Sequence, residues 1–96
     1  SLPEDGENWI RQCMQEMTPR VRGFHKLRTR KAGAQRFVDV HMLVDPEMSV
    51  ARGHELADEL VSQIKERYPR ATVTMHIEPR DGTEESFDCD GRLSLP

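Results

Sequence analysis

Hydrophobic positions recur along this chain with two periods, and the switches between them predict two helices and three strands. The first helix begins at Pro3, which a first helical turn tolerates, beside acidic residues that favour the positive end of the helix dipole. Thr18-Pro19 ends it, because the residue before a proline avoids helical geometry. Its apolar stripe has three- and four-residue spacing and consists of Trp9, Ile10, Cys13, Met14 and Met17.

A period of two follows and predicts a hairpin. Its first strand covers Val21 to Arg30 with imperfect alternation, and Lys31–Gln35, centred on Gly33, forms the turn. Its second strand, 37–45, alternates clearly. One face of this strand is aliphatic, with Val38, Val40, Met42 and Val44, and the other is mixed, with Phe37, Asp39, His41 and Leu43.

The helical period returns between Ser49, a suitable N-cap, and Pro69. We expect His54 at the border of the buried side of this helix and not on its outer face. That buried side consists of Val50, Gly53, Ala57, Leu60, Ile64 and Tyr68. A last strand runs from Ala71 to Pro79. Its core-facing residues are Val73, Met75 and Ile77, and the residues facing the other way are Thr72, Thr74, His76 and Glu78.

The order helix, strand, strand, helix, strand predicts the fold. A helix that joins two strands of one sheet forms a right-handed crossover, so the second and third strands are parallel beside an antiparallel hairpin. Both helices then cover the valine-rich face and leave the other face open. We therefore expect an α+β, ferredoxin-like αββαβ open-faced sandwich with a three-stranded mixed sheet.

Length and charge add a domain boundary. The 96 residues predict one domain over 1–79 and an acidic, flexible tail over 80–96. The tail carries the whole net charge of −3, which argues against a nucleic-acid binder that depends on bulk positive charge. Cys13 and Cys89 are too few for a disulfide framework and favour a reducing compartment. No apolar run reaches the roughly 20 residues of a membrane span, so we expect a soluble chain, although its start without methionine is compatible with a fragment of a longer membrane protein.

The open face carries side chains that bind divalent metals. Strand alternation puts His41, His76 and Glu78 on it. If the hairpin is symmetric about Gly33, His25 lies directly opposite His41, whereas a different loop length would separate the two. Imidazole with carboxylate suits Zn²⁺, with cobalt, nickel, iron or manganese as alternatives.

Other residues bear on this metal hypothesis less directly. Asp39 shares the open face and could accept a hydrogen bond from a metal-binding imidazole. Cys89 is either a further ligand or an exposed free thiol. Taken singly, each histidine is more simply interpreted as an ordinary surface or packed residue. Three on one face with two acids favour a metal site over that interpretation.

Two further patterns concern other functions. The sequence has no Ser/His/Asp order and no glycine-rich phosphate loop, so we expect no enzyme activity. The basic segment from Arg20 to Arg36 could contact phosphate or lipid headgroups, and the alternative is an ordinary solvated hairpin.

A set of short motifs runs through residues 3–79: His25-Lys26-Leu27-Arg28-Thr29-Arg30, Gly33, Phe37-Val38-Asp39-Val40-His41, Val44-Asp45, Ser49, His54, Asp58, Ile64 and Val73-Thr74-Met75-His76-Ile77-Glu78-Pro79. In combination they resemble the cytoplasmic C-terminal domain of cation diffusion facilitator transporters. The resemblance implies a metallochaperone-like domain on the cytoplasmic side of a membrane, below a six-helix transmembrane domain. It further implies a V-shaped homodimer that binds zinc or a similar cation and thereby favours transport by a divalent-cation/proton antiporter.

The same resemblance assigns ligands. It implies that His25, His41 and His76 belong to one site, and that His54 belongs to an adjacent site which shares His76 and Glu78. The family often has aspartate where this chain has Glu78, so the geometry of the second site depends on the longer side chain. Two other functions stay open: a free-standing soluble metallochaperone, and a ferredoxin-like nucleic-acid or small-ligand binding module that uses the basic hairpin.

Overall fold

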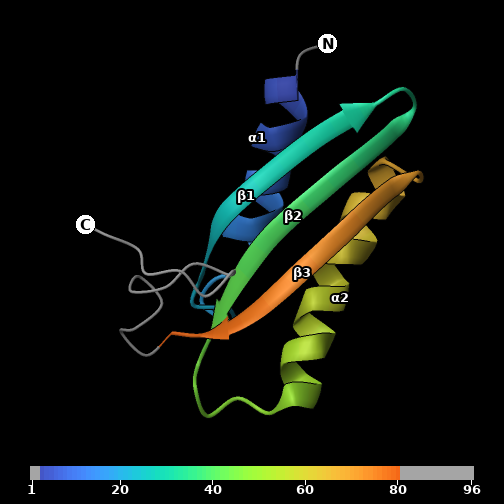
Figure 1. The fold of residues 1–96 in the computed structure, drawn as a ribbon. Helices are drawn as coiled ribbons and strands as arrows, with labels where there is room; N and C mark the ends of the chain where they lie inside the picture. Colours follow the sequence, from blue (N-terminus) through green and yellow to red (C-terminus); the bar gives the residue numbers. More distant parts are fainter. Residues whose placement is uncertain (1–2, 81–96) are drawn as a thin grey trace, which may run out of the picture.

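The computed structural model describes residues 3–80 and confirms the predicted order of the elements. The elements are α1 (Pro3–Gln15), β1 (Gly23–Ala32), β2 (Gln35–Val44), α2 (Val50–Arg67) and β3 (Ala71–Pro79). β2 is the central strand, antiparallel to β1 and parallel to β3. Both helices lie on one side of the sheet, so the predicted αββαβ open-faced sandwich is confirmed (Figure 1). Apart from Arg80, the predicted tail lies outside the described residues, and so does Cys89.

Local hydrogen bonds account for the helix boundaries. Ser49 caps α2 as predicted, because its hydroxyl oxygen accepts a hydrogen bond of 3.0 Å from the Arg52 amide. α1 ends at Gln15, earlier than the predicted stop at Thr18. There the Thr18 hydroxyl donates a 2.8 Å hydrogen bond to the Gln15 carbonyl, which satisfies one of the carbonyl groups that a helix end leaves free.

The core lies between the two helices and the covered face of the sheet. Its buried residues include Ile10, Cys13, Met14 and Met17 from α1 and the turn after it, Val38, Val40, Met42 and Val44 from β2, and Leu56, Ala57, Leu60 and Ile64 from α2. Removing these side chains from water is the main favourable contribution to folding. Cys13 and the methionines Met14, Met17 and Met42 therefore serve the core, as predicted, and Met75 packs against it partly buried.

Three predicted burial assignments are wrong. Val50 is 85% exposed, because it is the first residue of α2 and the buried residues of that helix start at Gly53. The His54 side chain is 71% exposed, since one residue after Gly53 is about 100° further around the helix. Ile77 is 39% exposed, because β3 is an edge strand and Ile77 lies near its end.

The turn of the β1–β2 hairpin differs from the predicted one. Ala32 pairs with Gln35, so the turn is centred between Gly33 and Ala34 and not on Gly33. A turn of this length alone would pair His41 with the residue after His25 and turn the His25 side chain to the other face.

A β-bulge in β1 restores the predicted pairing. Between His25 and Arg28 the strand has one extra residue, and Lys26 adopts a left-handed φ of 56° there. The pairing shifts by one residue across this bulge, so His25 pairs with His41. His25 and His41 are therefore neighbours, as predicted. They are so because the turn and the bulge each shift the pairing by one residue, in opposite directions.

The molecule has two distinct ends (Figure 1). The start of α1, the β1–β2 turn and the connection from α2 to β3 lie together at what we call the N-terminal end, and the β2–α2 loop and the end of β3 lie at the opposite end. Neither described helix is long and apolar enough to cross a membrane.

Candidate metal centre

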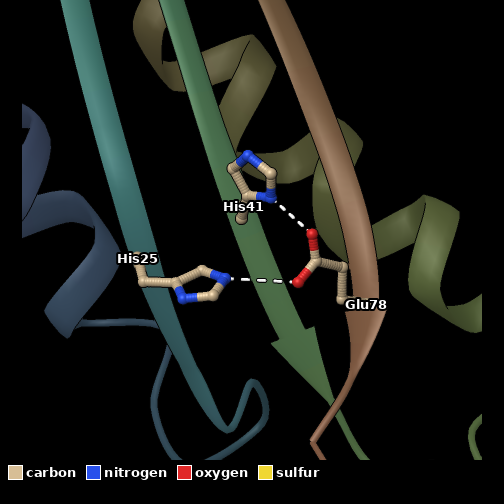
Figure 2. Close-up of side chains that lie close together, drawn as sticks. All are labelled: His25, His41 and Glu78. Carbon is tan, nitrogen blue, oxygen red and sulfur yellow. Dashed lines mark hydrogen bonds and ion pairs between the residues drawn. The ribbon is translucent and has the colours of Figure 1, made fainter. Parts of the chain in front are cut away.

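Three strands bring His25, His41 and Glu78 together on the sheet face that the helices do not cover (Figure 2). One potential ligand atom from each residue lies within 4.8 Å of the other two. Strand alternation places His41 and Glu78 on this face, and the bulge brings His25 to it. All three lie toward the end of the molecule opposite the N-terminal end, because they stand at the start of β1 and near the ends of β2 and β3.

The Glu78 carboxylate joins the two imidazoles. Its Oε1 lies 3.2 Å from His25 Nε2, and its Oε2 forms a hydrogen bond with His41 Nδ1. Because an ionised carboxylate only accepts hydrogen bonds, each imidazole donates an N–H to it. The two rings meet edge to face, with centroids 5.2 Å apart and planes at 87°. Glu78 thus orients both rings toward one point.

Burial and hydrogen bonding shift the pKa of the Glu78 carboxyl in opposite directions. His41 is only 2% exposed, whereas the side chains of His25 and Glu78 are 26% and 27% exposed. Burial raises the pKa of the Glu78 carboxyl, but the hydrogen bonds from His41 and His25 and the electrostatic attraction to these two residues together outweigh burial and hold that pKa below its ordinary value. Glu78 is therefore an anion at neutral pH and can bind a cation without first losing a proton.

His76 lies beside this group without being part of it. It pairs with His41 in the parallel ladder, and the two rings stack with centroids 4.4 Å apart and planes at 15°. Its Nε2 is 3.0 Å from Asp39 Oδ1. Asp39 therefore contacts an imidazole of the open face, which is the kind of contact that the sequence predicted for it.

His54 is not brought to the group within this single chain. It lies on α2, on the helix side of the sheet, and its Nδ1 is 3.8 Å from Asp58 Oδ2. Both side chains are 71% exposed. A role for His54 as a ligand therefore needs a site other than the one that His25, His41 and Glu78 form.

The sequence comparisons identify the family. The family described as "Cation efflux protein, cytoplasmic domain" matches residues 2–80. The chain belongs to this family. "Cation-efflux pump FieF" of Pectobacterium carotovorum subsp. carotovorum (strain PC1) is 31% identical over 86 residues, which are 90% of this chain and 28% of that protein. The chain thus spans less than a third of the length of this relative.

Solved structures of the family have the same fold. The zinc form of "Putative Zinc Transporter CzrB" gives a TM-score of 0.74 at 33% identity and covers 83% of this chain and 91% of that chain. The "Metal-bound C-terminal domain of CzcD transporter from Thermotoga maritima" gives a TM-score of 0.72 at 31% identity and covers 83% of this chain and 93% of that chain. The predicted resemblance and the ferredoxin-like fold are both confirmed.

The donor set of this cation efflux domain fits a divalent transition metal ion. Two imidazole nitrogens and one carboxylate are ligands that zinc and neighbouring first-row ions accept. A tetrahedral zinc site has four ligands, so His25, His41 and Glu78 leave one position for a further donor. The hard cations calcium and magnesium prefer oxygen ligands and fit this set poorly.

Proposed function

We propose that this domain is the metal-responsive part of a divalent-cation transporter and binds Zn²⁺, or a similar first-row ion, through His25, His41 and Glu78. The observation that carries this proposal is the convergence of two imidazoles and an ionised carboxylate from three strands within 4.8 Å. Membership of the cation efflux family supports the transporter context. The metal-bound domain of the Thermotoga maritima transporter supports metal chemistry on this fold.

In this proposal His76 is the fourth ligand. Its ring is stacked on His41, and its side chain is 37% exposed, so it has room to rotate. Binding would replace the contact between His76 Nε2 and Asp39 with a bond to the ion. Asp39 is then available to hold the other ring N–H, as carboxylates often do beside metal-binding histidines.

Metal binding has to rearrange protons at the centre. His25 Nε2 and His41 Nδ1 now face Glu78 as hydrogen-bond donors, and a nitrogen binds a metal only after losing its proton. Each ring must therefore move that proton to its other nitrogen or release it. Protons and metal compete for the same atoms, so affinity should fall as the pH falls.

We further propose a homodimer in which His54 contributes to an adjacent metal site with His76 and Glu78. The exposure of His54 leaves it accessible for this role. Metal shifts the dimer toward a closed arrangement only if it binds that arrangement more tightly than the open one. In the longer protein, such closure would favour divalent-cation/proton antiport.

Zinc calorimetry tests the ligands. The variant His25→Ala/His41→Ala/His76→Ala should lose high-affinity binding, whereas His54→Ala should keep it and lose only a second, weaker event. Because His41 is buried, circular dichroism must show that the triple variant is folded. Unchanged zinc affinity in the folded triple variant would refute the proposed site.

X-ray scattering tests the dimer. Adding zinc should change the profile from that of an open particle to that of a more compact dimer. Profiles that superimpose with and without zinc would rule out metal-driven closure.

The transporter context is tested at the level of the gene. Apolar spans of about 20 residues encoded upstream of this domain would make it part of a membrane protein. A gene without such spans would favour the free-standing metallochaperone.

A further inference from the structure

The N-terminal end of the molecule carries a cluster of basic residues that the metal centre does not use. The β1–β2 turn and the connection from α2 to β3 line a hollow of about 390 Å³ there. Its basic lining residues are Lys31, Arg36, Arg67 and Arg70, which we call the basic cluster. They lie in or beside two turns that are far apart in the sequence, so the fold gathers them.

The charge of the basic cluster is not balanced locally. Segments 30–36 and 65–71 hold six basic residues and one acidic residue, Glu66. Even with the first-turn acids Glu4 and Asp5 counted, basic residues outnumber acidic ones by six to three. Among the side chains that the structure describes, no member of the basic cluster forms an ion pair with a carboxylate, whereas Arg11, Arg20, Arg22 and Arg52 do.

Aromatic rings hold two of these cations in place. The Arg36 guanidinium lies 4.0 Å from the centre of the Tyr68 ring, and that of Arg67 lies 4.8 Å from the centre of the Trp9 ring. Cation–π contacts position a charge without neutralising it. A Cβ added to Gly6 would be 2.8 Å from Arg36 Nη1, so Arg36 passes directly over the first turns of α1. The cluster is thus anchored beside the point where the described chain begins.

We propose that the basic cluster docks on anionic lipid headgroups. This inference rests on the proposed function, because in a transporter whose membrane segments precede this domain the N-terminal end faces the bilayer. The solved relative from Thermotoga maritima is a C-terminal domain, which agrees with that order. Clusters of four or more basic residues close to a membrane bind anionic lipids electrostatically. The metal centre lies toward the opposite end and stays accessible while the cluster is docked (Figure 1).

Vesicle co-sedimentation of the 96-residue chain tests the inference. At an ionic strength of about 0.1 M the chain should bind vesicles of equal parts phosphatidylcholine and phosphatidylglycerol and should not bind phosphatidylcholine alone. Lys31→Gln/Arg70→Gln should weaken this binding by about tenfold or more, because each basic residue near an anionic surface contributes appreciably. These two residues are the better choice, since Arg36 and Arg67 also pack on aromatic rings.

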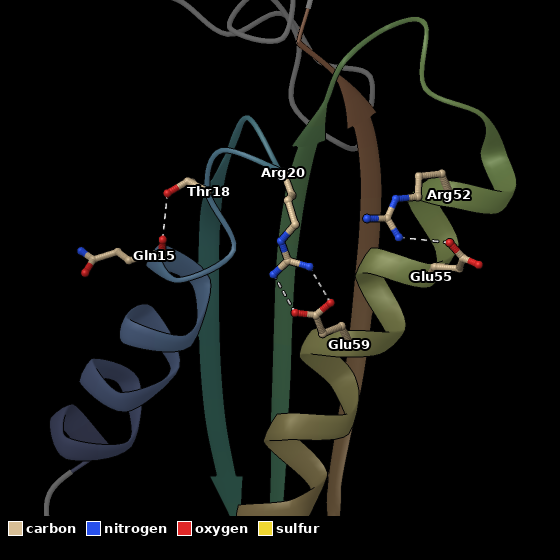
Figure 3. Close-up of polar contacts among 6 residues, drawn as sticks. All are labelled: Gln15, Thr18, Arg20, Arg52, Glu55 and Glu59. Carbon is tan, nitrogen blue, oxygen red and sulfur yellow. Dashed lines mark hydrogen bonds and ion pairs between the residues drawn. The ribbon is translucent and has the colours of Figure 1, made fainter.

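A matched control removes the same charge from the opposite end. Arg20 pairs with Glu59 at 2.8 Å, and Arg52 pairs with Glu55 at 3.1 Å (Figure 3). Arg20→Gln/Arg52→Gln lowers the net charge equally but should bind vesicles nearly as well as the parent chain. The reason is that charges separated by more than a Debye length, about 10 Å at 0.1 M salt, are largely screened.

Several outcomes overturn lipid docking: equal binding to both kinds of vesicle, equal losses in the two double variants, or tight binding of a single-stranded RNA with no binding to anionic vesicles. Zinc calorimetry of Lys31→Gln/Arg70→Gln separates this inference from the proposed function. A chain that binds zinc but ignores anionic vesicles overturns only the lipid inference. A chain that binds these vesicles through the cluster but binds no zinc supports lipid docking and overturns the metal function.

Discussion

His25 pairs with His41 across the β1–β2 ladder because a bulge lies between this pair and the hairpin turn. The bulge depends on Lys26, whose φ of 56° is in the left-handed region. A side chain other than glycine or asparagine is disfavoured there by about 1 kcal/mol. β-Bulges often lie beside functional sites, where they redirect a side chain. Here the redirected side chain is a proposed metal ligand.

Substitutions at Lys26 test this role of the bulge. Lys26→Gly should keep zinc affinity and raise the free energy of unfolding by up to about 1 kcal/mol, because glycine adopts positive φ without strain. Lys26→Val should lower the free energy of unfolding by about 1–2 kcal/mol, because a β-branched residue resists this conformation. It should also weaken zinc binding, because the register around His25 shifts. Urea denaturation and zinc calorimetry measure the two effects. Lys31→Val, in the regular part of the same ladder, should leave zinc affinity unchanged. Parent-like behaviour of Lys26→Val would contradict the role of the bulge.

The Glu78 carboxylate should dominate metal affinity among the acidic residues. Glu78→Gln keeps the length of the side chain but removes the charge that holds His25 and His41, so zinc affinity should fall by at least about tenfold. Calorimetric titration measures the affinity. Glu55→Gln changes the net charge equally at an exposed position of α2 and should have no effect. Equal affinities of the two variants would exclude Glu78 as a ligand.

The Arg20–Glu59 pair links the turn after α1 to α2 and should make stability depend on pH (Figure 3). The hydrogen bond from Arg20 holds the pKa of the Glu59 carboxyl below its ordinary value, against a smaller opposing effect of burial. A carboxyl whose pKa is lower in the folded chain stabilises the fold above its ordinary pKa, and this contribution disappears as the pH falls through the folded pKa.

Thermal melts of Glu59→Gln across pH measure that contribution. The variant should melt below the parent chain near neutral pH and together with it in strong acid. The difference should be small and sensitive to salt, because the pair is exposed. Arg20→Gln should reproduce the effect, and the double variant should lose little more than either single variant. A difference that stays constant from neutral to strongly acid pH would contradict this assignment.

Two helical glycines should respond differently to alanine. Gly53 is buried in α2, and an added Cβ would meet Ile77 at 3.5 Å, an ordinary contact. Gly53→Ala should therefore raise the free energy of unfolding by about 0.5–1 kcal/mol through helix propensity. Gly6→Ala brings the same propensity gain to α1 but places a Cβ 2.8 Å from Arg36, so it should gain less. Chemical denaturation compares the two, and a larger gain at Gly6 would contradict the packing described here.

Patterns of the sequence were sufficient for the elements and the faces of the sheet. The period of two in β2 and β3 places His41, His76 and Glu78 together because side chains alternate along any strand, whatever surrounds it. The helical stripes of α1 and α2 likewise predicted most of the core residues that the two helices and the turn after α1 contribute. These features depend on local geometry, which neighbouring residues determine.

Only the tertiary structure decided which of these residues meet. Residues 24–32 of β1 contain no glycine or asparagine to signal a left-handed residue at Lys26, so the bulge that puts His25 opposite His41 had no local signature. The exposure of His54 depends on where α2 begins relative to the sheet. Glu78 bridges two imidazoles only because segments that are distant in sequence pack side by side, and the same is true of the basic cluster. Such contacts arise from the packing of the whole chain, and the periodicity of the sequence does not predict them.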